Sequence, residues 1–212
     1  MKDEKKVSVP VIRRLPRYLR YLKEALASGV KRISSREIGR RLGATDSQVR
    51  QDLNNFGGFG QQGYGYDTEI LSEKIGHILC TDRDFTAILV GAGSLGTALA
   101  RHMEFERYGV RLIGLFDNNP AVIGSRIGRF TVKPIAELTD FCRKNSPDIA
   151  VLTLPGEAVD RSAEILESMK IKGFWNFTGR ELNVPGVAVE NVHLEDSLML
   201  LTYAVGSSGK NQ

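Results

Sequence analysis

Three glycines at the spacing G-x-G-x-x-G form the stretch of this sequence whose chemistry is easiest to name. Residues 91–96 read GAGSLG, directly after the apolar run 87–90 and directly before good helix formers. This order predicts a strand, a tight turn and a helix. Gly91 turns the chain, Gly93 lets a pyrophosphate approach the backbone, and Gly96 lets the helix pack on the strand. Phosphates are favoured at the helix N-terminus. The predicted dinucleotide contacts in this turn are Gly91, Ala92, Gly93, Ser94, Leu95 and Gly96.

A carboxylate follows these glycines at the distance that a dinucleotide site requires. A second apolar run, residues 110–116, ends in Asp117, about 20 residues beyond Gly96. An acid at the tip of a second strand accepts hydrogen bonds from the adenosine ribose hydroxyls and repels a 2′-phosphate. We therefore expect NADH and NAD⁺ as cofactors rather than their 2′-phosphorylated forms. The alternative is a glycine-rich turn in some other α/β domain.

A further strand end is expected beside the same crevice. Residues 149–154 read IAVLTL, a buried strand that stops at Pro155 and Gly156. In open α/β sheets, ligands bind outside the carboxyl ends of the strands, so Thr153 and Pro155 are predicted cofactor contacts. NADH and NAD⁺ differ only in the nicotinamide ring, and a switch needs contacts that distinguish the two. The segment 153–155 is one candidate for them.

The composition is that of an ordinary globular protein. A chain of 212 residues with 42% hydrophobic content suffices for two small domains. No apolar run reaches the roughly 18 residues of a membrane span, and no apolar signal core follows the charged N-terminus. We expect a cytoplasmic protein with no membrane partner. Cys80 and Cys142 have no C-x-x-C or nearby histidine partner, so they are interpreted as buried hydrophobes and no metal site is expected.

Charge is distributed unevenly along the chain. Residues 1–63 contain 14 Lys and Arg against 6 Asp and Glu, a net charge of +8, whereas residues 64–212 carry 15 against 19, a net charge of −4. A basic segment that neutralises phosphates gains from counterion release, so the asymmetry indicates a polyanionic partner. The alternative is a solvated basic surface.

The first helix is predicted within this basic segment. Apolar residues between Leu15 and Leu26 recur at helical spacing. Pro16 suits a first turn, and Gly29 suits a stop. We expect the helix to run from about Pro16 to Ser28.

A helix-turn-helix is predicted directly afterwards. Residues 34–37 (SSRE) carry a capping-box pattern that opens a helix over 35–42, and residues 45–48 (TDSQ) carry a second one that opens a helix over 46–55. Gly43 lies in the turn between them. Two short helices joined by a turn that contains glycine are the helix-turn-helix signature.

The outward face of the second helix carries side chains that suit base edges and phosphates. Behind it, residues 57–66 (GGFGQQGYGY) indicate a hairpin, a wing that can lie along a minor groove or the backbone. The alternatives are an exposed polar face and a plain linker. Together with the charge asymmetry, the pattern favours double-stranded DNA as partner. The predicted DNA contacts are Arg14, Ser47, Gln48, Arg50, Gln51, Asn54, Gln61 and Tyr64.

The expected fold class is α/β, a winged helix-turn-helix domain followed by a Rossmann-like parallel sheet. The predicted division is a winged-helix DNA-binding domain over 1–68, a linker helix over 69–84, an NAD(H)-binding domain over 85–194, and a last helix with tail over 195–212. In the third segment we expect a strand end and helix over 132–144, a helix over 158–169, and strands over 173–177 and 187–189.

These motifs resemble, in sequence and in order, those of one known family. The segments VRQDLNNFGGFGQQGYGY, VGAGSLGTAL, LFD, TLPGEA, WNF and VENVHLEDSLMLL are similar to those of the Rex family of redox-sensing transcriptional repressors. The resemblance spans about residues 15–203. It implies a homodimer that binds an inverted-repeat operator when NADH is scarce and releases it when NADH binds. It also implies that the protein is not an enzyme, so no catalytic residue is expected.

The resemblance further implies a domain-swapped last helix, exchanged between subunits and packed by the partner's nucleotide site. In this chain the helix would span 196–206 (DSLMLLTYAVG). Its residues Leu198, Leu201 and Val205 make an apolar stripe that is too strong for a free tail. The start of this helix, near 193–196, is the second candidate for contacts at the nicotinamide.

Interdomain coupling is the point at which the sequence departs from the family. Arg20 occupies the place of a family arginine that links the DNA-binding domain to the nucleotide domain. Where its acidic partner is expected, the chain has His193 followed by Leu194. A tyrosine often found soon after the glycine motif is replaced by His102. These departures concern the coupling mechanism, not the fold or the ligand.

Two other functions are alternatives to a repressor. An NAD-dependent dehydrogenase needs a general acid or base beside its substrate, but the three histidines, His77, His102 and His193, lie in no substrate domain. Too little chain remains to build such a domain, and a structural role is expected for each histidine. A sensor of CoA or another nucleotide on the same fold is disfavoured by Asp117.

Overall fold

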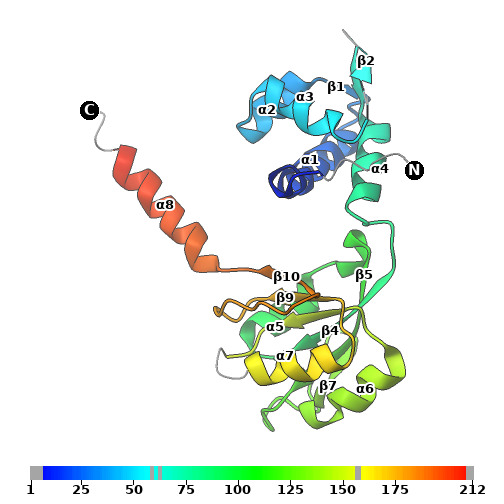
Figure 1. Ribbon diagram of the computed structural model, residues 1–212, viewed down its shortest axis with the longest axis vertical. Coiled ribbons are helices and arrows are strands. Elements are labelled where there is room, and N and C mark those ends of the chain that lie inside the picture. Colours follow the sequence, from blue (N-terminus) through cyan, green and yellow to red (C-terminus); the bar gives the residue numbers. More distant parts are fainter. Residues whose placement is uncertain (1–6, 58–59, 62–63, 156–158, 209–212) are drawn as a thin grey trace. The chain divides into compact units, whose positions relative to one another are not determined.

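The computed structural model describes residues 7–57, 60–61, 64–155 and 159–208 (Figure 1). It divides into two compact units, Met1–Asp82 and Arg83–Gln212, each with its own sheet and its own hydrophobic core.

The N-terminal unit combines four helices with a small antiparallel sheet in its described part, in the strand order β1-β3-β2. Tyr66 of the central strand pairs with Ile33 on one side and Gly60 on the other. Its elements are α1 (Val9–Ala27), β1 (Arg32–Ile33), α2 (Ser35–Leu42), α3 (Asp46–Asn54), β2 (Gly60–Gln61), β3 (Gly65–Asp67) and α4 (Thr68–Ile78).

Helix α1 begins at Val9, so the predicted start at Pro16 is wrong. Pro10 lies in the first turn, where a missing N–H is tolerated, whereas Pro16 lies inside the helix. An internal proline costs about 3 kcal/mol. Val11 and Leu15 are both buried, and each contributes roughly 1.5 to 3 kcal/mol, which offsets that cost.

The two short helices begin where the capping patterns predict, but only one forms the complete box. The Ser34 hydroxyl accepts from the Glu37 N–H at 3.2 Å, and the Glu37 carboxylate accepts from the Ser34 N–H at 2.7 Å. At α3 the Thr45 hydroxyl accepts from the Gln48 N–H at 3.1 Å, without the reciprocal bond. The Gln48 side chain turns instead to the charged carboxylate of Asp52, to which its amide nitrogen donates at 2.9 Å.

One hydrophobic core joins the four helices of this unit. α4 contributes to it and lies in the N-terminal unit, and it ends at Ile78, earlier than the linker helix expected over 69–84. The largest fully buried side chains are Leu15, Tyr18, Leu22, Ile38, Leu53, Leu71 and Ile75.

The second unit is built on a seven-stranded sheet of order β10-β9-β8-β4-β5-β7-β6. All neighbours pair in parallel except β6, a short strand absent from the predicted elements, which pairs antiparallel with β7. The strands are β4 (Phe85–Val90), β5 (Val110–Asp117), β6 (Arg126–Ile127), β7 (Phe130–Pro134), β8 (Ile149–Leu152), β9 (Gly173–Asn176) and β10 (Ala188–Asn191).

The order of these strands marks a ligand crevice. The chain runs from β4 outward through β5 to β7, then crosses back to β8 and runs outward through β9 to β10. This is the doubly wound order, in which ligands bind where the direction reverses, between β4 and β8. The described helices are α5 (Ser94–His102), α6 (Leu138–Asn145), α7 (Val159–Ser168) and α8 (Leu194–Ser208), with 3₁₀ turns η1 (Phe105–Tyr108) and η2 (Ile135–Glu137).

Both faces of this sheet are buried. On β4, Ile88 and Val90 face one core cluster while Ala87 and Leu89 face the other, because successive side chains of a strand alternate. A strand covered on both faces is apolar throughout, which explains the run at 87–90. The winged helix-turn-helix and the mostly parallel α/β sheet of the predicted fold class are confirmed.

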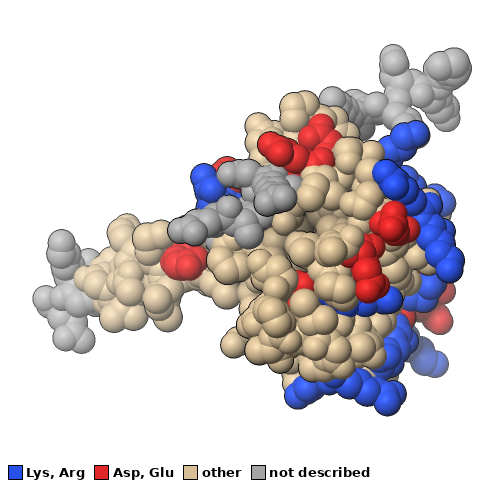
Figure 2. Space-filling view, turned by 90° about the horizontal axis from the view of Figure 1, so that it is seen from below, with Lys and Arg blue, Asp and Glu red and all other residues tan. Residues whose placement is uncertain are grey.

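Helix α8 differs from the other helices in exposing its apolar side chains. Leu198, Leu200, Leu201, Tyr203 and Val205 are each at least 59% exposed. The charges of the helix are confined to its first turn, and the rest of its surface in Figure 2 is uncharged. Nothing in the described chain covers this helix. None of the described helices has both the length and the apolarity needed to cross a bilayer.

Candidate functional site

The glycine turn lies at the carboxyl end of β4. Gly91 has φ +104, a conformation that side chains rarely adopt, and a Cβ there would lie 2.7 Å from the backbone of Thr153. The Thr153 hydroxyl donates to the Gly91 carbonyl at 2.7 Å. The Thr153 side chain thus bonds to the backbone of the glycine turn and holds that turn against the carboxyl end of β8.

The other two glycines of the motif differ in their surroundings. A Cβ on Gly96 would overlap the Gly91 carbonyl oxygen and lie 2.7 Å from the Thr153 hydroxyl, so only glycine fits where α5 crosses the turn. A Cβ on Gly93 would meet nothing within 4 Å. Gly93 caps α5 without a side chain, so the open space lies at a helix N-terminus with unpaired N–H groups, where a phosphate fits.

Asp117 lies beside this turn, at the end of β5. It is 7% exposed, and its carboxylate accepts from the Ala92 N–H at 2.5 Å and from the Asn119 N–H at 2.7 Å. Each carboxylate oxygen keeps a second acceptor position, which a ribose hydroxyl can use. Asp117 thus braces the glycine turn in addition to the predicted ribose contact.

The remaining predicted cofactor residues lie around the same strand ends. Ala92 is buried, Leu95 is half-buried, and Ser94 and Pro155 are exposed. The structure therefore brings the predicted residues together at the β4–β8 crevice. The part of the predicted turn at 156–158 lies outside the described residues.

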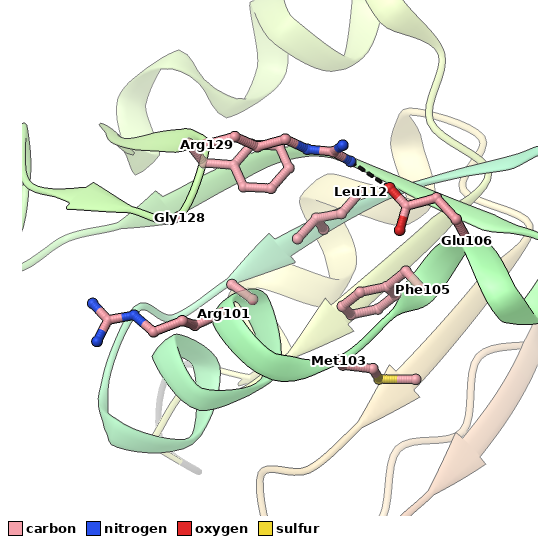
Figure 3. Close-up of a pocket in the computed structure, with 9 residues that line it drawn as sticks. Arg101, Met103, Phe105, Glu106, Leu112, Gly128 and Arg129 are labelled. Carbon is pink, nitrogen blue, oxygen red and sulfur yellow. Dashed lines mark hydrogen bonds and ion pairs between the residues drawn. The ribbon is translucent and has the colours of Figure 1, made fainter.

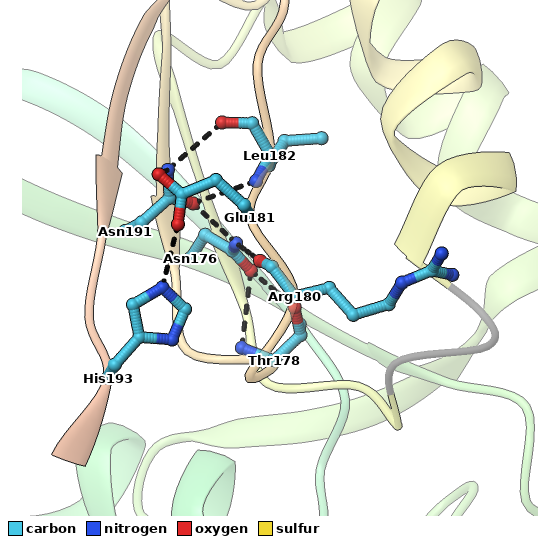
Figure 4. Close-up of polar contacts among 7 residues, drawn as sticks. All are labelled: Asn176, Thr178, Arg180, Glu181, Leu182, Asn191 and His193. Carbon is cyan, nitrogen blue, oxygen red and sulfur yellow. Dashed lines mark hydrogen bonds and ion pairs between the residues drawn. The ribbon is translucent and has the colours of Figure 1, made fainter. Parts of the chain in front are cut away.

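A polar cluster occupies the ends of β9 and β10 (Figure 4). Asn176 is 1% exposed and donates to Asn191 at 2.7 Å. Asn191 in turn donates to Glu181 at 3.2 Å, and the imidazole Nε2 of His193 lies 2.9 Å from the second oxygen of that carboxylate. The hydrogen bond to Glu181 raises the pKa of His193 above its ordinary value. From the sequence, His193 was noted as a departure from the family and as part of a candidate nicotinamide contact, but its pairing with Glu181 was missed because Glu181 carries no motif.

A separate hollow of about 240 Å³ lies near the amino ends of β5 and β7 (Figure 3). Phe105 and Leu112 line it, and Arg129 donates to Glu106 at 2.5 Å across its rim. None of the predicted cofactor residues lies there. The hollow is therefore distinct from the strand-end crevice.

In the N-terminal unit, four predicted DNA contacts share the exposed face of α3. Ser47, Arg50, Gln51 and Asn54 are all exposed. Arg50 donates to Asp46 at 2.5 Å, one helical turn earlier, and its side chain stays 54% exposed. The guanidinium is thus oriented on the helix surface.

Two other predicted contacts instead point to a buried carboxylate. Arg14 donates to both oxygens of Asp52, at 2.6 and 2.7 Å, and Gln48 donates at 2.9 Å. The Tyr18 hydroxyl also donates to Asp52, at 2.6 Å. Burial would raise the pKa of Asp52, but these hydrogen bonds hold it below its ordinary value. Arg14 and Tyr18 therefore fix α3 against α1, whereas Gln48 bonds to Asp52 from within α3 itself.

Asp52 was missed from the sequence, although a signal was present. Its side chain is fully buried and lies between Val49 and Leu53, the two apolar residues that anchor α3. An acid within the buried stripe of a helix needs a partner, and basic residues on α1 are available. That pairing accounts for the position of the Arg14 side chain, and its predicted contact with DNA stays a prediction.

The wing is described in part. Tyr64 is 71% exposed, and the Arg32 guanidinium lies 5.8 Å from its ring centre and donates to its carbonyl at 3.1 Å. Gln61 belongs to β2, and its side chain lies outside the described residues, as do residues 58–59 and 62–63. Arg32 adds a cation to the wing that only the pairing of β1 with β3 reveals. Arg20, the predicted coupling residue, is exposed.

Comparison with known protein families agrees with both units. Residues 6–54 match a family model described as the N-terminus of putative DNA-binding proteins, and residues 82–179 match a CoA-binding domain. The redox-sensing transcriptional repressor Rex of Caldicellulosiruptor bescii is 52% identical over 96% of this chain and 94% of its own. That of Clostridioides difficile is 49% identical over 96% of this chain and 97% of its own.

Solved structures give the same result. The crystal structure of RSP, a Rex-family repressor, has a TM-score of 0.88 and 45% identity, and the match covers 97% of each chain. RSP in complex with β-NADH has a TM-score of 0.89 and 44% identity, again over 97% of each chain. RSP in complex with β-NAD⁺ and operator DNA has a TM-score of 0.88 and 47% identity, over 96% of this chain and 94% of that one. The chain therefore belongs to the Rex family of redox-sensing transcriptional repressors.

Proposed function

We propose that this protein is a repressor that senses the ratio of NADH to NAD⁺, binding an inverted-repeat operator when NADH is low and releasing it when NADH binds. One observation carries the proposal. A glycine turn braced by Asp117 occurs in the same chain as a helix-turn-helix whose α3 exposes Ser47, Arg50, Gln51 and Asn54. The names of the relatives, all repressors, argue against a dehydrogenase.

The cofactor site lies at the β4–β8 crevice. The pyrophosphate lies on the open backbone at Gly93 and the N-terminus of α5, and the adenosine ribose bonds to Asp117. Crystal structures of the similar RSP with β-NADH and with β-NAD⁺ support this ligand pair. Ala92, Ser94 and Leu95 supply the backbone of the turn, and the backbone of residues 153–155 faces the nicotinamide end.

The DNA site is the outer face of α3 together with the wing. Arg50, Gln51 and Asn54 have the side-chain geometries that suit base edges in a major groove, and Ser47 suits a phosphate near the helix start. Gln61, Tyr64 and Arg32 belong to the wing. Arg14 contributes by fixing the recognition helix to α1 through Asp52, and Gln48 orients the same carboxylate from within α3. The crystal structure of the similar RSP in complex with operator DNA supports DNA as the partner of this unit.

The subunits pair through α8. Contiguous apolar surface of this kind on a monomer marks an interface, and seven large apolar side chains of the helix are more than half exposed. Exchange of the helix between two copies buries that surface symmetrically. We infer a homodimer whose chain comprises a winged-helix domain over 1–68, a linker segment over 69–84 that contains most of α4, a nucleotide domain over 85–194 and the exchanged helix over 195–212. A repressor must reach its operator, and we place it in the cytoplasm.

Release of DNA requires contacts that distinguish NADH from NAD⁺. The neutral nicotinamide of NADH favours closure against the residues at 153–155 and the partner's helix start near 193–196. Closure rotates the winged domains until the recognition helices no longer meet half-sites about 34 to 36 Å apart, or a multiple of that distance. Arg20 links the two domains. By linkage, operator DNA must weaken NADH binding by the same factor by which NADH weakens operator binding.

The test is a titration of NADH and NAD⁺, separately, into a fluorescent operator complex. Release by NADH at concentrations that leave the complex intact in NAD⁺ is expected. A chain truncated before Glu195 should keep its glycine turn but lose dimeric operator binding. If neither dinucleotide changed operator affinity, or if the truncated chain remained a dimer released by NADH, the proposal would fail.

A further inference from the structure

We propose that Glu181 is a positioning residue for α8, holding His193 directly before the helix and making subunit pairing stronger at mildly acidic than at alkaline pH. The proposal rests on the proposed exchange of α8. It deepens that function, because it identifies what fixes the start of the exchanged helix in this chain.

His193 lies at the junction between strand and helix. β10 ends at Asn191, and the last backbone bond of the sheet is from the Val192 N–H to the Asn176 carbonyl, at 2.8 Å. α8 begins at Leu194. His193 is thus the residue between the last fixed point of the sheet and the first residue of the helix.

The side chain of His193 is tied back to the sheet through Glu181 (Figure 4). Its Nε2 lies 2.9 Å from one carboxylate oxygen, and the other oxygen accepts from the Asn191 side chain at 3.2 Å. The Asn191 amide also pairs with both backbone groups of Leu182, at 3.1 and 3.0 Å. The carboxylate therefore has a defined position, although Glu181 itself is exposed.

The hydrogen bonds that position Glu181 begin at a buried residue of the sheet, Asn176. Asn176, 1% exposed, donates to the Asn191 side chain and to the Arg180 carbonyl, both at 2.7 Å. The side-chain oxygen Oδ1 of Asn176 accepts from the Thr178 hydroxyl at 2.7 Å. A continuous path of hydrogen bonds thus runs from the interior of the sheet to the start of α8.

The protonation state of His193 decides how strong its hydrogen bond to Glu181 is. A carboxylate only accepts, so Nε2 must carry a proton whether the imidazole is neutral or charged. A second proton, on Nδ1, adds a positive charge beside Glu181 and makes the hydrogen bond charge-assisted on both sides. The other charged groups beside the ring are Glu195 and Asp196 in the first turn of α8, and both favour that charge. The Arg180 side chain extends away from the ring in Figure 4.

The direction of the pH dependence follows from the raised pKa of His193, whose first cause is the hydrogen bond to Glu181. A raised folded-state pKa stabilises the folded chain, and with it the contact that fixes the start of α8, by an amount that is complete below the ordinary value of 6.5 and is lost as the pH rises through the folded value. Above that window the start of α8 is held less firmly. Pairing then costs more conformational entropy, so the dimer dissociates more readily.

The chain contains a second histidine–carboxylate pair that serves as a matched control for His193 and Glu181. The Nδ1 of His77 lies 2.8 Å from the Asp82 carboxylate, and that histidine side chain is 72% exposed. This pair resembles His193 and Glu181 in chemistry but lies at the end of α4. A substitution that removes the His77–Asp82 contact alters an exposed histidine–carboxylate pair but changes no residue of α8.

The experiment measures dimer dissociation by analytical ultracentrifugation at about pH 6 and about pH 8.5, which bracket the titration of a histidine. For the unmodified chain the dissociation constant should rise roughly two- to fivefold between these values, the range expected for an exposed ion pair. Glu181→Gln should lose this rise, as should His193→Gln, which keeps an N–H donor but cannot titrate. Asp82→Asn should behave as the unmodified chain does.

NMR titration of the three histidines separates the possible failures. The proposal predicts a lower pKa for His193 in Glu181→Gln than in the unmodified chain. An unchanged pKa, or a Glu181→Gln dimer with the full pH dependence, would overturn it. Removal of residues 194–212 tests the proposed function instead. A dimer that survives this removal would show that α8 does not pair the subunits, whatever the His193 titration gives.

Discussion

The carboxylate of Asp117 accepts a hydrogen bond from the backbone N–H of Ala92 at 2.5 Å, so the acid expected to read the ribose also fixes the turn that receives the pyrophosphate. Two parts of a dinucleotide site are thereby coupled. A change at Asp117 must affect both, because the turn loses its brace when the ribose loses its acceptor.

Asp117→Ala should weaken NADH binding by roughly 1.5 to 3 kcal/mol, the range for a hydrogen bond to a charged group, and reduce discrimination against NADPH. Asp117→Asn keeps an acceptor for the Ala92 N–H and removes the charge that repels a 2′-phosphate. It should therefore retain the turn and lose mainly the discrimination. Calorimetric titration with NADH and NADPH measures both effects, and unchanged NADH affinity in Asp117→Ala would remove Asp117 from the site.

Gly93 and Gly96 offer a matched pair, since the same added methyl group meets open space at one and backbone at the other. Gly96→Ala should destabilise the nucleotide-binding unit by about 3 kcal/mol, the upper part of the range for an overpacked site. Gly93→Ala should lower the melting temperature much less than Gly96→Ala, since its only structural cost is a poorer N-cap, and should weaken NADH binding roughly tenfold or more, because the methyl group occupies the place of the pyrophosphate.

Thermal unfolding and NADH titration of the two variants provide the check. Equal loss of stability in both would contradict the open space at Gly93. Full NADH affinity in Gly93→Ala would move the pyrophosphate away from this turn.

Asp52 should be necessary for the stability of the DNA-binding unit. Asp52→Ala leaves Arg14 and the buried Tyr18 hydroxyl without their acceptor, at an expected cost of about 3 kcal/mol, the low end for breaking a buried pair because Arg14 keeps some solvent access. Urea unfolding measures this cost. A variant as stable as the parent chain would mean that the network is not a structural tie.

The same residue predicts a response to acid. The pKa of Asp52 is lowered below 3.8 in the folded chain, so its stabilisation is present above that value and is lost as the pH falls through the lowered pKa. Asp52→Asn should therefore show a smaller loss of stability than the parent chain in this acid range. An identical acid profile would assign the loss to other carboxylates.

Arg50 on α3 should contribute to operator binding. Arg50→Ala is expected to lose about 1 to 3 kcal/mol of operator affinity while NADH binding and dimerisation stay intact. Arg143→Ala is the control, because Arg143 is also an exposed arginine paired with an aspartate on its own helix, but it lies on α6. A normal operator footprint from Arg50→Ala would mean that another element reads the DNA.

Local patterns predicted most of the elements correctly. The apolar run before Gly91, the capping box at Ser34 and the alternation of strands and helices after Asp117 each depend on neighbours in sequence. The start of α1 was not predictable in this way, because burial of Val11 and Leu15 against other helices offsets an internal proline. The short strand β6 exists through its pairing with β7 and has no pattern of its own.

The candidate sites also divide into residues that local sequence patterns predict and contacts that only the packing of distant segments creates. The exposed face of α3 follows from helical periodicity, so Ser47, Arg50, Gln51 and Asn54 could be named from spacing alone. The partners of Asp52 and Glu181 could not, since Arg14 is 38 residues from Asp52 and His193 is 12 residues from Glu181. Contacts at such separations depend on how the elements pack, and single-sequence periodicity carries no information about that.

The exposed apolar surface of α8, through which we propose that the subunits pair, has a consequence for the genetics of this protein. A copy with a damaged α3 but an intact α8 would still exchange helices with a normal copy, and the mixed dimer would present one working recognition helix to an operator with two half-sites. Such an allele should be dominant in a cell that carries both. An allele that lacks α8 cannot enter the mixed dimer and should be recessive. With the proposed pairing through α8, the inheritance of defects in this protein is thus set by the surface that joins its subunits.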